Sequence, residues 1–261
     1  MMGTNHALTG AAAWLAVTAA APAITTGLMP QSTAGVLVGA LVCAGAALLP
    51  DADHHNGTIA HSVPVVGQAV TAAIGQAAGG HRQGLHSLLA TIGVAAASIG
   101  LGYVQITLDG WGTLALGPGV AAMALIAFAA KALKLTRGSW VLPWILGAIV
   151  AALIVFFAPA ETAWLPVAVT LGFLVHLGGD MLTKGGVPLV WPWKPKPPNW
   201  WQGTPVLNRI WQPNGYFAVP ILGTTGSALE MVLGLVVGAY VTVVIVFEVL
   251  WAMGINVFAL L

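Results

Sequence analysis

Long apolar stretches alternate with short polar segments along the chain, and seven such stretches can be distinguished. Each has about the 20 mostly apolar residues that a helix needs to cross the hydrocarbon core of a membrane. Because backbone N–H and C=O groups in lipid must find hydrogen-bond partners within their own segment, we expect these stretches to be helical. The pattern therefore predicts an all-α fold, a polytopic transmembrane bundle of about seven spanning helices. The predicted spans cover residues 7–28, 33–50, 86–107, 117–135, 138–158, 163–182 and 227–251.

Two of the connecting segments are longer than the others. Residues 51–85 are polar at both ends and weakly apolar over residues 63–79, which favours a re-entrant or interfacial helix there. Residues 183–226 hold half of the 16 prolines and five of the 11 tryptophans, so we expect a structured, non-helical loop. Tryptophan is enriched at the depth of the lipid headgroups, which is where this loop is predicted to lie. Its tryptophans are Trp191, Trp193, Trp200, Trp201 and Trp211.

The composition agrees with a membrane protein and excludes a soluble domain. Hydrophobic residues make up 58% of the 261 residues and charged residues only 6%, whereas soluble domains carry roughly 25% charged residues. We therefore expect one transmembrane domain over residues 1–261, with membrane lipids as its main partner. The lone Cys43 provides neither a disulfide framework nor a cysteine zinc site. The first apolar stretch lacks the basic flank of a signal peptide, so we expect it to remain as a helix.

Charge is distributed unevenly between the two predicted faces of the membrane. With seven crossings, all eight lysines and arginines fall on the face where the chain begins, which the positive-inside rule makes cytoplasmic. We therefore expect a multi-pass protein of the bacterial cytoplasmic membrane with its N-terminus inside. The net charge of +1 and the absence of a basic patch give no reason to expect nucleic acid as a partner. The cations are Arg82, Lys131, Lys134, Arg137, Lys184, Lys194, Lys196 and Arg209.

Histidines and carboxylates gather on the same predicted face, although they are spread over more than 220 residues of sequence. His176 and Asp180 are four residues apart on a predicted helix, so their side chains share one side of it. Asp51 and Asp53 follow Pro50 on a predicted tight turn, an arrangement suited to bridging two cations. Imidazole and carboxylate groups are typical ligands of zinc and related divalent metals. The candidate ligands are His6, Asp51, Asp53, His54, His81, His86, His176, Asp180 and Glu230.

These ligands outnumber what one ion needs, which favours two or three divalent ions, with zinc as the expected metal. Clusters of this kind are typical of phosphoester hydrolysis. Asp53 is the candidate general base, and Arg82 the candidate clamp for phosphoryl oxygens, with a headgroup anchor as its alternative role. His6 is either a ligand or an interfacial residue. Glu230 is either a ligand or a cap of the last predicted helix, whose start is indicated by residues 224–227.

Five sequence strings together resemble the bacterial YdjM-like inner-membrane metal-dependent hydrolases. They are His6 and residues 48–54, 81–87, 176–180 and 185–192. That family is distantly similar to zinc-dependent phospholipase C and to single-strand-specific nucleases with a trinuclear zinc cluster. The resemblance implies phosphoester hydrolysis and a ligand role for Glu230. The chain departs from the family pattern at residues 83–85, where Gly-x-Thr is expected between the two histidines, so the shape of this turn is expected to differ.

The sequence thus predicts a membrane-embedded metal-dependent hydrolase acting on a lipid-like phosphorylated substrate, such as a phospholipid or an isoprenoid phosphate. The alternative is a metal-binding carrier or sensor without hydrolysis. A transporter normally places its ligands near the middle of the membrane on broken helices, whereas these ligands lie at predicted helix ends. An intramembrane metalloprotease is expected to carry His-Glu-x-x-His, which is absent from the chain.

Overall fold

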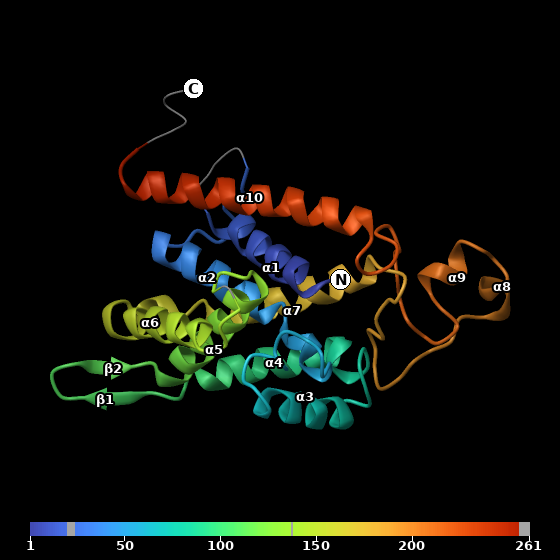
Figure 1. Cartoon of the computed structure of the whole chain (residues 1–261), viewed down its shortest axis with the longest axis horizontal. Helices are drawn as coiled ribbons and strands as arrows, with labels where there is room; N and C mark the ends of the chain where they lie inside the picture. The colour runs from blue at the N-terminus through green and yellow to red at the C-terminus, as the bar shows by residue number, and fades with distance from the viewer. Residues whose placement is uncertain (20–23, 137, 256–261) are drawn as a thin grey trace.

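The computed structural model describes residues 1–19, 24–136 and 138–255, and this part of the chain is mostly helical (Figure 1). Arg137, one of the predicted cytoplasmic cations, and residues 20–23 of the first predicted span lie outside the described residues. The α-helices of the described residues are α1 (Gly3–Thr18), α2 (Thr33–Ala46), α3 (Val66–Ala77), α4 (Leu88–Leu101), α5 (Leu116–Ala132), α6 (Leu142–Phe157), α7 (Leu165–Met181), α8 (Asn199–Gln202), α9 (Leu207–Ile210) and α10 (Ala228–Ala252). Short 3-10 helices are η1 (Leu49–Asp53), η2 (Gly84–His86) and η3 (Pro159–Thr162), and the strands are β1 (Ile106–Leu108) and β2 (Gly112–Leu114).

Each of the seven predicted apolar stretches overlaps one of the longer helices: α1, α2, α4, α5, α6, α7 and α10. Helix α3 lies within residues 63–79. Three helix starts are set by serine caps, because the side chains of Ser32, Ser87 and Ser227 accept hydrogen bonds from backbone N–H groups in the first turns of α2, α4 and α10. The mostly helical class predicted from the pattern is therefore confirmed.

The number of spanning helices is not confirmed. Among the described residues, two helical stretches are long and apolar enough to cross a membrane: residues Thr33–Asp53, 21 residues long, and α10, 25 residues long. Helices α4, α5, α6 and α7 have 14 to 17 residues. At about 1.5 Å per residue they extend about 21–26 Å, less than the roughly 30 Å of the hydrocarbon core. The apolar stretches were longer than these helices because apolar residues continue into the adjoining turns.

A short hairpin replaces the end of the predicted span over residues 86–107. Helix α4 ends at Leu101, and β1 then pairs antiparallel with β2, with Ile106 opposite Leu114. Gly110 and Gly112, with φ of +81° and +75°, allow the turn between the strands. The all-α prediction missed this hairpin because its β-branched residues read as a continuation of the apolar stretch.

Helix α2 lies at the centre of the bundle and packs against α1, α5 and α7. Trp14, Val36 and Ile126 are fully buried in this core. Gly45 brings α2 and α5 into backbone contact, since a Cβ atom at Gly45 would lie 1.9 Å from the carbonyl oxygen of Leu125. The C-terminal end of α2, and η1 directly after it, are thereby held in the interior between α1 and α7.

The outer surface of the bundle is apolar. Most of α10 is exposed, and Leu235 and Val236 are 74% and 63% exposed. Leucine and isoleucine side chains of α4 and α6 are exposed as well. Exposed apolar surface of this extent is typical of an interaction with lipid or with another protein. Because α10 is long, apolar and little buried, it differs from the core helix of a soluble protein.

The N-terminus, the start of α10 and the segment with α8 and α9 lie toward one end of the molecule, and the β1–β2 hairpin lies toward the other (Figure 1). The prediction of a non-helical loop over residues 183–226 was wrong for α8 and α9, which are four-residue helices. The rest of this loop is held to α7, where the N–H of Val219 donates to the carbonyl of Met181 at 2.6 Å. Trp193 and Trp200 are exposed.

Candidate metal centre

Four elements place the candidate ligands. Helix α1 carries His6, η1 carries Asp51 and Asp53, η2 carries His86, and α7 carries His176 with Asp180 one turn later. Pro50 lies in the first turn of η1, and the following 3-10 turn directs the chain inward after α2 ends. Ser87 caps α4 directly after His86 and donates its own hydroxyl hydrogen to the carbonyl of Gly84 at 2.6 Å. Local turn chemistry therefore fixes the backbone on both sides of η2.

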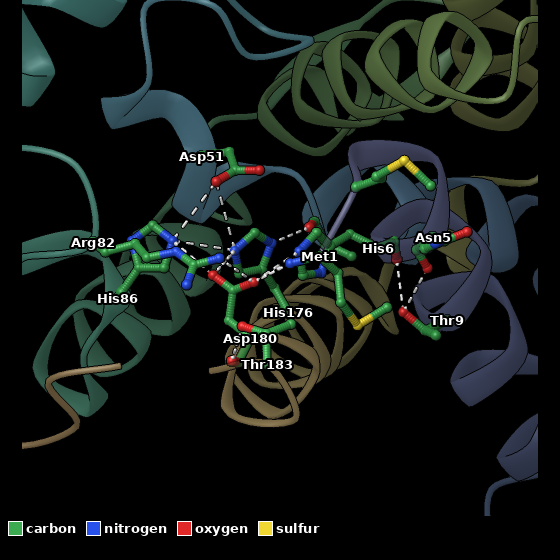
Figure 2. A network of polar contacts seen from close by, with 12 residues as sticks. Met1, Asn5, His6, Thr9, Asp51, Arg82, His86, His176, Asp180 and Thr183 are labelled. Atoms are coloured by element: carbon green, nitrogen blue, oxygen red, sulfur yellow. Dashed lines mark hydrogen bonds and ion pairs between the residues drawn. The ribbon is translucent and has the colours of Figure 1, made fainter. Parts of the chain in front are cut away.

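Two histidines meet at the centre of the cluster. Nε2 of His86 lies 3.2 Å from Nε2 of His176 (Figure 2). Nδ1 of His176 is 2.7 Å from the carbonyl oxygen of Ala47, which can only accept, so this nitrogen carries the hydrogen. In the neutral ring of His176 the Nε2 atom therefore presents a lone pair toward His86.

Two carboxylates lie on opposite sides of this histidine pair (Figure 2). Oδ1 of Asp51 is 3.7 Å from Nε2 of His86 and 3.8 Å from Nε2 of His176. Oδ2 of Asp180 is 3.6 Å and 3.7 Å from the same two atoms, and it is buried with no hydrogen-bond partner among the described residues. A buried carboxylate oxygen without a donor is costly, so this atom is suited to binding a cation.

The spacing of these four atoms fits a metal ion. A tetrahedral zinc ion with bonds of about 2.0–2.1 Å separates neighbouring ligand atoms by about 3.3–3.4 Å. The distance between the two histidine nitrogens and the four distances from these nitrogens to the carboxylate oxygens range from 3.2 to 3.8 Å. The chemistry of the set, two imidazoles and two carboxylates, is also that of zinc sites. His86, His176, Asp51 and Asp180 can therefore hold one divalent ion with small adjustments.

A second group of possible ligands shares residues with the first. It consists of Asp51, Asp53, His81 and His86, whose ligand atoms lie within 4.8 Å of one another. Oδ1 of Asp53 is hydrogen-bonded to Nδ1 of His81 at 2.8 Å, and Oδ2 lies 3.3 Å from Nδ1 of His86. Asp53 is buried, and Asp51 is partly exposed.

His6 completes a third group with Asp51 and His176. Its ring is stacked on the ring of His176, with centroids 3.7 Å apart and an angle of 14° between the planes. Nε2 of His6 lies 3.3 Å from Oδ1 of Asp180, and neither ring nitrogen has a hydrogen-bond partner among the described residues. His6 is fully buried, so its role as an interfacial residue is not supported by the structure.

The electrostatic environment of His86 favours a positive charge on its ring. Burial lowers the pKa of His86, but the carboxylates of Asp51 and Asp53 outweigh burial and raise it to about 9. The N-terminal ammonium group of Met1 donates to Oδ1 of Asp180. Acceptor groups thus attract protons and cations into one buried volume.

Arg82 lies beside the cluster and is held at three points. Its backbone N–H donates to Oδ2 of Asp53 at 3.1 Å, its carbonyl accepts from the hydroxyl of Tyr216 at 2.9 Å, and its Nη2 donates to Oδ1 of Asp180 at 3.0 Å. Its φ of +57° is rare for a side-chain-bearing residue and shows that the surroundings determine its conformation. Gly185 provides room for the guanidinium, since a Cβ atom there would lie 2.0 Å from Nη1.

A cleft of about 360 Å³ opens onto this cluster. Polar side chains from several parts of the chain form its wall. The cleft and the cluster are connected through Asp51 and Arg82, which line the cleft. Asp53, by contrast, does not line it. The cleft is lined in part by Asp51, His54, Asn56, His81, Arg82, Lys184 and Thr224.

Two predicted ligands lie outside the three groups. His54 is at the cleft, where its ring makes an edge contact with the ring of His81 and its Nδ1 accepts from the N–H of Asn56. Glu230 is at the start of α10, and its carboxylate accepts from the N–H of Met2 at 2.5 Å and from the N–H of Gly226 at 2.8 Å. These contacts agree with the capping alternative for Glu230.

Some contributing groups were not anticipated. The Ala47 carbonyl orients His176, and Tyr216 holds the backbone of Arg82 across 134 residues of sequence. A backbone carbonyl has no sequence signal. Tyr216 is the lone tyrosine in a loop rich in tryptophan, which could have suggested a specific role for it. The sequence gives no sign that its partner is the carbonyl of Arg82.

The model of the YdjM inner membrane protein family matches residues 1–252, which include the whole cluster and α10. The chain belongs to the YdjM inner membrane protein family. No curated protein and no solved structure matches the chain. Membership in the YdjM family confirms the resemblance predicted from the five sequence strings, and it confirms an inner membrane protein. The YdjM family description names no activity, so chemistry must be argued from the cluster.

Proposed function

We propose that the protein is a membrane-embedded, metal-dependent hydrolase of phosphoesters, with a phospholipid or an isoprenoid phosphate as its type of substrate. The observation that carries this proposal is the approach of two carboxylates, from Asp51 and Asp180, to the facing Nε2 atoms of His86 and His176. Within the described residues Oδ2 of Asp180 has no donor, and the cleft reaches the cluster at Asp51. A buried site rich in acceptor atoms can bind metal ions, and the adjoining open cleft can admit a substrate to them.

The overlapping groups support more than one ion. His86, His176, Asp51 and Asp180 would hold one divalent ion, and Asp53 with His81 would extend the site to a second. His6, together with Asp51 and His176, would be close enough to hold a third ion. Divalent ions such as zinc supply a lowered pKa of water and stabilisation of charge on phosphoryl oxygens.

Arg82 would bind the phosphoryl group of the substrate. Its guanidinium lines the cleft while one nitrogen contacts Asp180, so it can face an anion without losing its anchor. A guanidinium matches the geometry of phosphate oxygens and stabilises charge that develops on them. In the role of proton acceptor, Asp51 fits better than Asp53, because Asp51 faces the cleft whereas both oxygens of Asp53 are engaged by His81, His86 and the N–H of Arg82.

A lipid substrate follows from the setting of the cleft. The chain is an inner membrane protein with an apolar outer surface, and a water-soluble substrate would not need a centre held within such a bundle. If the chain crosses the membrane seven times, the uneven distribution of lysines and arginines would make the side with the N-terminus and the cleft cytoplasmic. The Trp-rich loop, with exposed Trp193 and Trp200, would border the route of an amphiphile.

The test is a hydrolysis assay on the purified full-length chain with quantified metal. Phospholipids and isoprenoid phosphates are screened for release of phosphate or of a phosphorylated headgroup, with zinc present and after chelation. We expect at least two ions per chain and metal-dependent release that Asp180→Asn abolishes. Stoichiometric metal without hydrolysis of any member of either class would instead support the metal-binding carrier or sensor. Hydrolysis by a metal-free preparation would contradict both.

A further inference from the structure

We infer that a second polar cavity beside the cleft is an anion subsite that binds a second phosphate group of the substrate. This inference rests on the proposed function and makes its substrate class narrower. The cavity has a volume of about 600 Å³, within the range of small-molecule sites. Its wall comes from the loop between α7 and α10. Its polar lining residues are Lys184, Asn208, Arg209, Gln212 and Asn214.

Lys184 joins the two spaces, since it lines both the cavity and the cleft that reaches the metal cluster. Its backbone is held on both sides. The N–H of Lys184 donates to the carbonyl of Gly223 at 2.8 Å, and its carbonyl accepts from Nε2 of Gln212 at 2.8 Å. Gln212 is itself part of the cavity wall. The ammonium group of Lys184 therefore extends from a rigid base at the junction of cleft and cavity.

The charge of the cavity suits an anion. Lys184 and Arg209 contribute two positive charges, and none of the described lining residues is acidic. Neither cation forms an ion pair with a carboxylate within the described part of the chain, whereas Arg82 is paired with Asp180. Lysine and arginine without internal partners are free to bind phosphate oxygens.

The order of the cations suggests how a substrate would lie. Arg82 is beside the metal cluster, Lys184 borders the cleft and the cavity, and Arg209 lies in the cavity. A substrate with its reacting phosphoryl group at Arg82 would extend its polar part past Lys184 toward Arg209. The cavity exceeds the needs of a single phosphate, so it suits a phosphorylated polar headgroup. The favoured substrate class is therefore a phosphoester that carries a second phosphate.

The first test measures anion binding without chemistry. Detergent-solubilised full-length protein is stripped of metal by chelation, and binding of inorganic pyrophosphate is measured by calorimetry. We expect the double variant Lys184→Gln/Arg209→Gln to bind at least 10-fold more weakly than the wild type. The matched control is Lys196→Gln, an exposed lysine of the same loop outside the cavity wall, which should change binding less than 2-fold. Equal binding by wild type and double variant would overturn the subsite.

The second test separates a lipid from a soluble source of the second phosphate. Reconstituted protein with zinc is offered vesicles of phosphatidylcholine containing either phosphatidylinositol or phosphatidylinositol phosphate, and in parallel a water-soluble inositol bisphosphate. A preference of at least 10-fold for the vesicles with the second phosphate, lost in the double variant, would support a lipid headgroup. Preference confined to the soluble compound would overturn the lipid source.

Failure of the subsite and failure of the proposed function give different results. Pyrophosphate binding that depends on Lys184 and Arg209, in a protein that hydrolyses no phosphoester, would support the subsite and overturn the hydrolase. Metal-dependent hydrolysis with the same substrate preference in wild type and double variant would support the hydrolase and overturn the subsite. Circular dichroism and gel filtration of the variants establish that both are folded.

Discussion

Two buried carboxylates near the N-terminal segment have opposite surroundings. The carboxylate of Glu230 accepts hydrogen bonds from the N–H groups of Met2 and Gly226 and from the side-chain amide of Asn5 at 2.9 Å. At Asp180, Oδ1 accepts from Met1 and Arg82, while Oδ2 faces two histidine nitrogens with no donor among the described residues. Both are buried acids on helices, yet one is satisfied by protein donors and the other is not.

The difference separates a structural acid from a ligand. A buried carboxylate whose oxygens receive N–H donors is stabilised by the fold itself. Acceptors that face one another in a buried volume repel unless a proton or a metal cation lies between them. Glu230 therefore connects the chain start to α10, and Asp180 is available to a cation. Replacing the carboxylate by an amide should therefore affect metal binding at Asp180 and stability at Glu230.

The largest effect is expected from Asp180→Asn, which keeps the shape of the side chain but removes its charge. Because Asp180 is a proposed ligand that contacts His6, His86 and Arg82, we expect loss of bound metal and loss of hydrolysis by at least about 1000-fold. Metal is measured by mass spectrometry of the purified protein. Glu230→Gln serves as the matched control and should retain its ions. Equal metal loss in both variants would contradict the division between the two acids.

Arg82→Lys comes next, since lysine keeps the charge but lacks the fork that contacts phosphate oxygens. We expect metal content to remain and hydrolysis to fall about 100-fold to 1000-fold, the range for removal of one donor to a developing charge. Steady-state kinetics measure the fall. Gly185→Ala should reproduce part of it, because its Cβ would displace the guanidinium by contact with Nη1. Unchanged rates in both variants would assign Arg82 to headgroup anchoring.

Removal of metal should destabilise the wild type. A ligand present at about 100 times its Kd stabilises the folded state by about 2.7 kcal/mol, and chelation removes this contribution. We therefore expect a lower unfolding temperature after chelation for the wild type and no such change for Asp180→Asn. Thermal unfolding in detergent, followed by circular dichroism, measures the shift. A shift of equal size in both proteins would mean that the metal binds elsewhere.

The smallest effect concerns the stability of Glu230→Gln. The neutral amide weakens charge-assisted hydrogen bonds from Met2, Asn5 and Gly226, and each such bond contributes about 1.5–3 kcal/mol. We expect a loss of about 1–3 kcal/mol in the free energy of unfolding, measured by denaturant titration in detergent, at normal metal content. Full stability with a loss of metal would make Glu230 a ligand after all.

Local patterns predicted a good part of this protein. Helical spacing placed His176 and Asp180 on one side of α7, and the Pro50 turn placed Asp51 and Asp53 together, because both relations depend only on neighbouring backbone geometry. The hairpin after α4 and the number of spanning helices were not predictable in this way. Apolar residues in turns look the same as apolar residues in helices when only hydropathy is considered.

The sequence by itself determined the membrane class, the mostly helical fold, the family and a set of metal-binding residue types, because these follow from composition, periodicity and short motifs. Only the tertiary structure decided which of those residues meet. The ring of His6 lies on that of His176, and Glu230 turns to backbone N–H groups, because packing of α1 between α10 and α7 sets distances across more than 160 residues of chain. Whether an acid has donors or lacks them depends on such contacts, and no local pattern contains them.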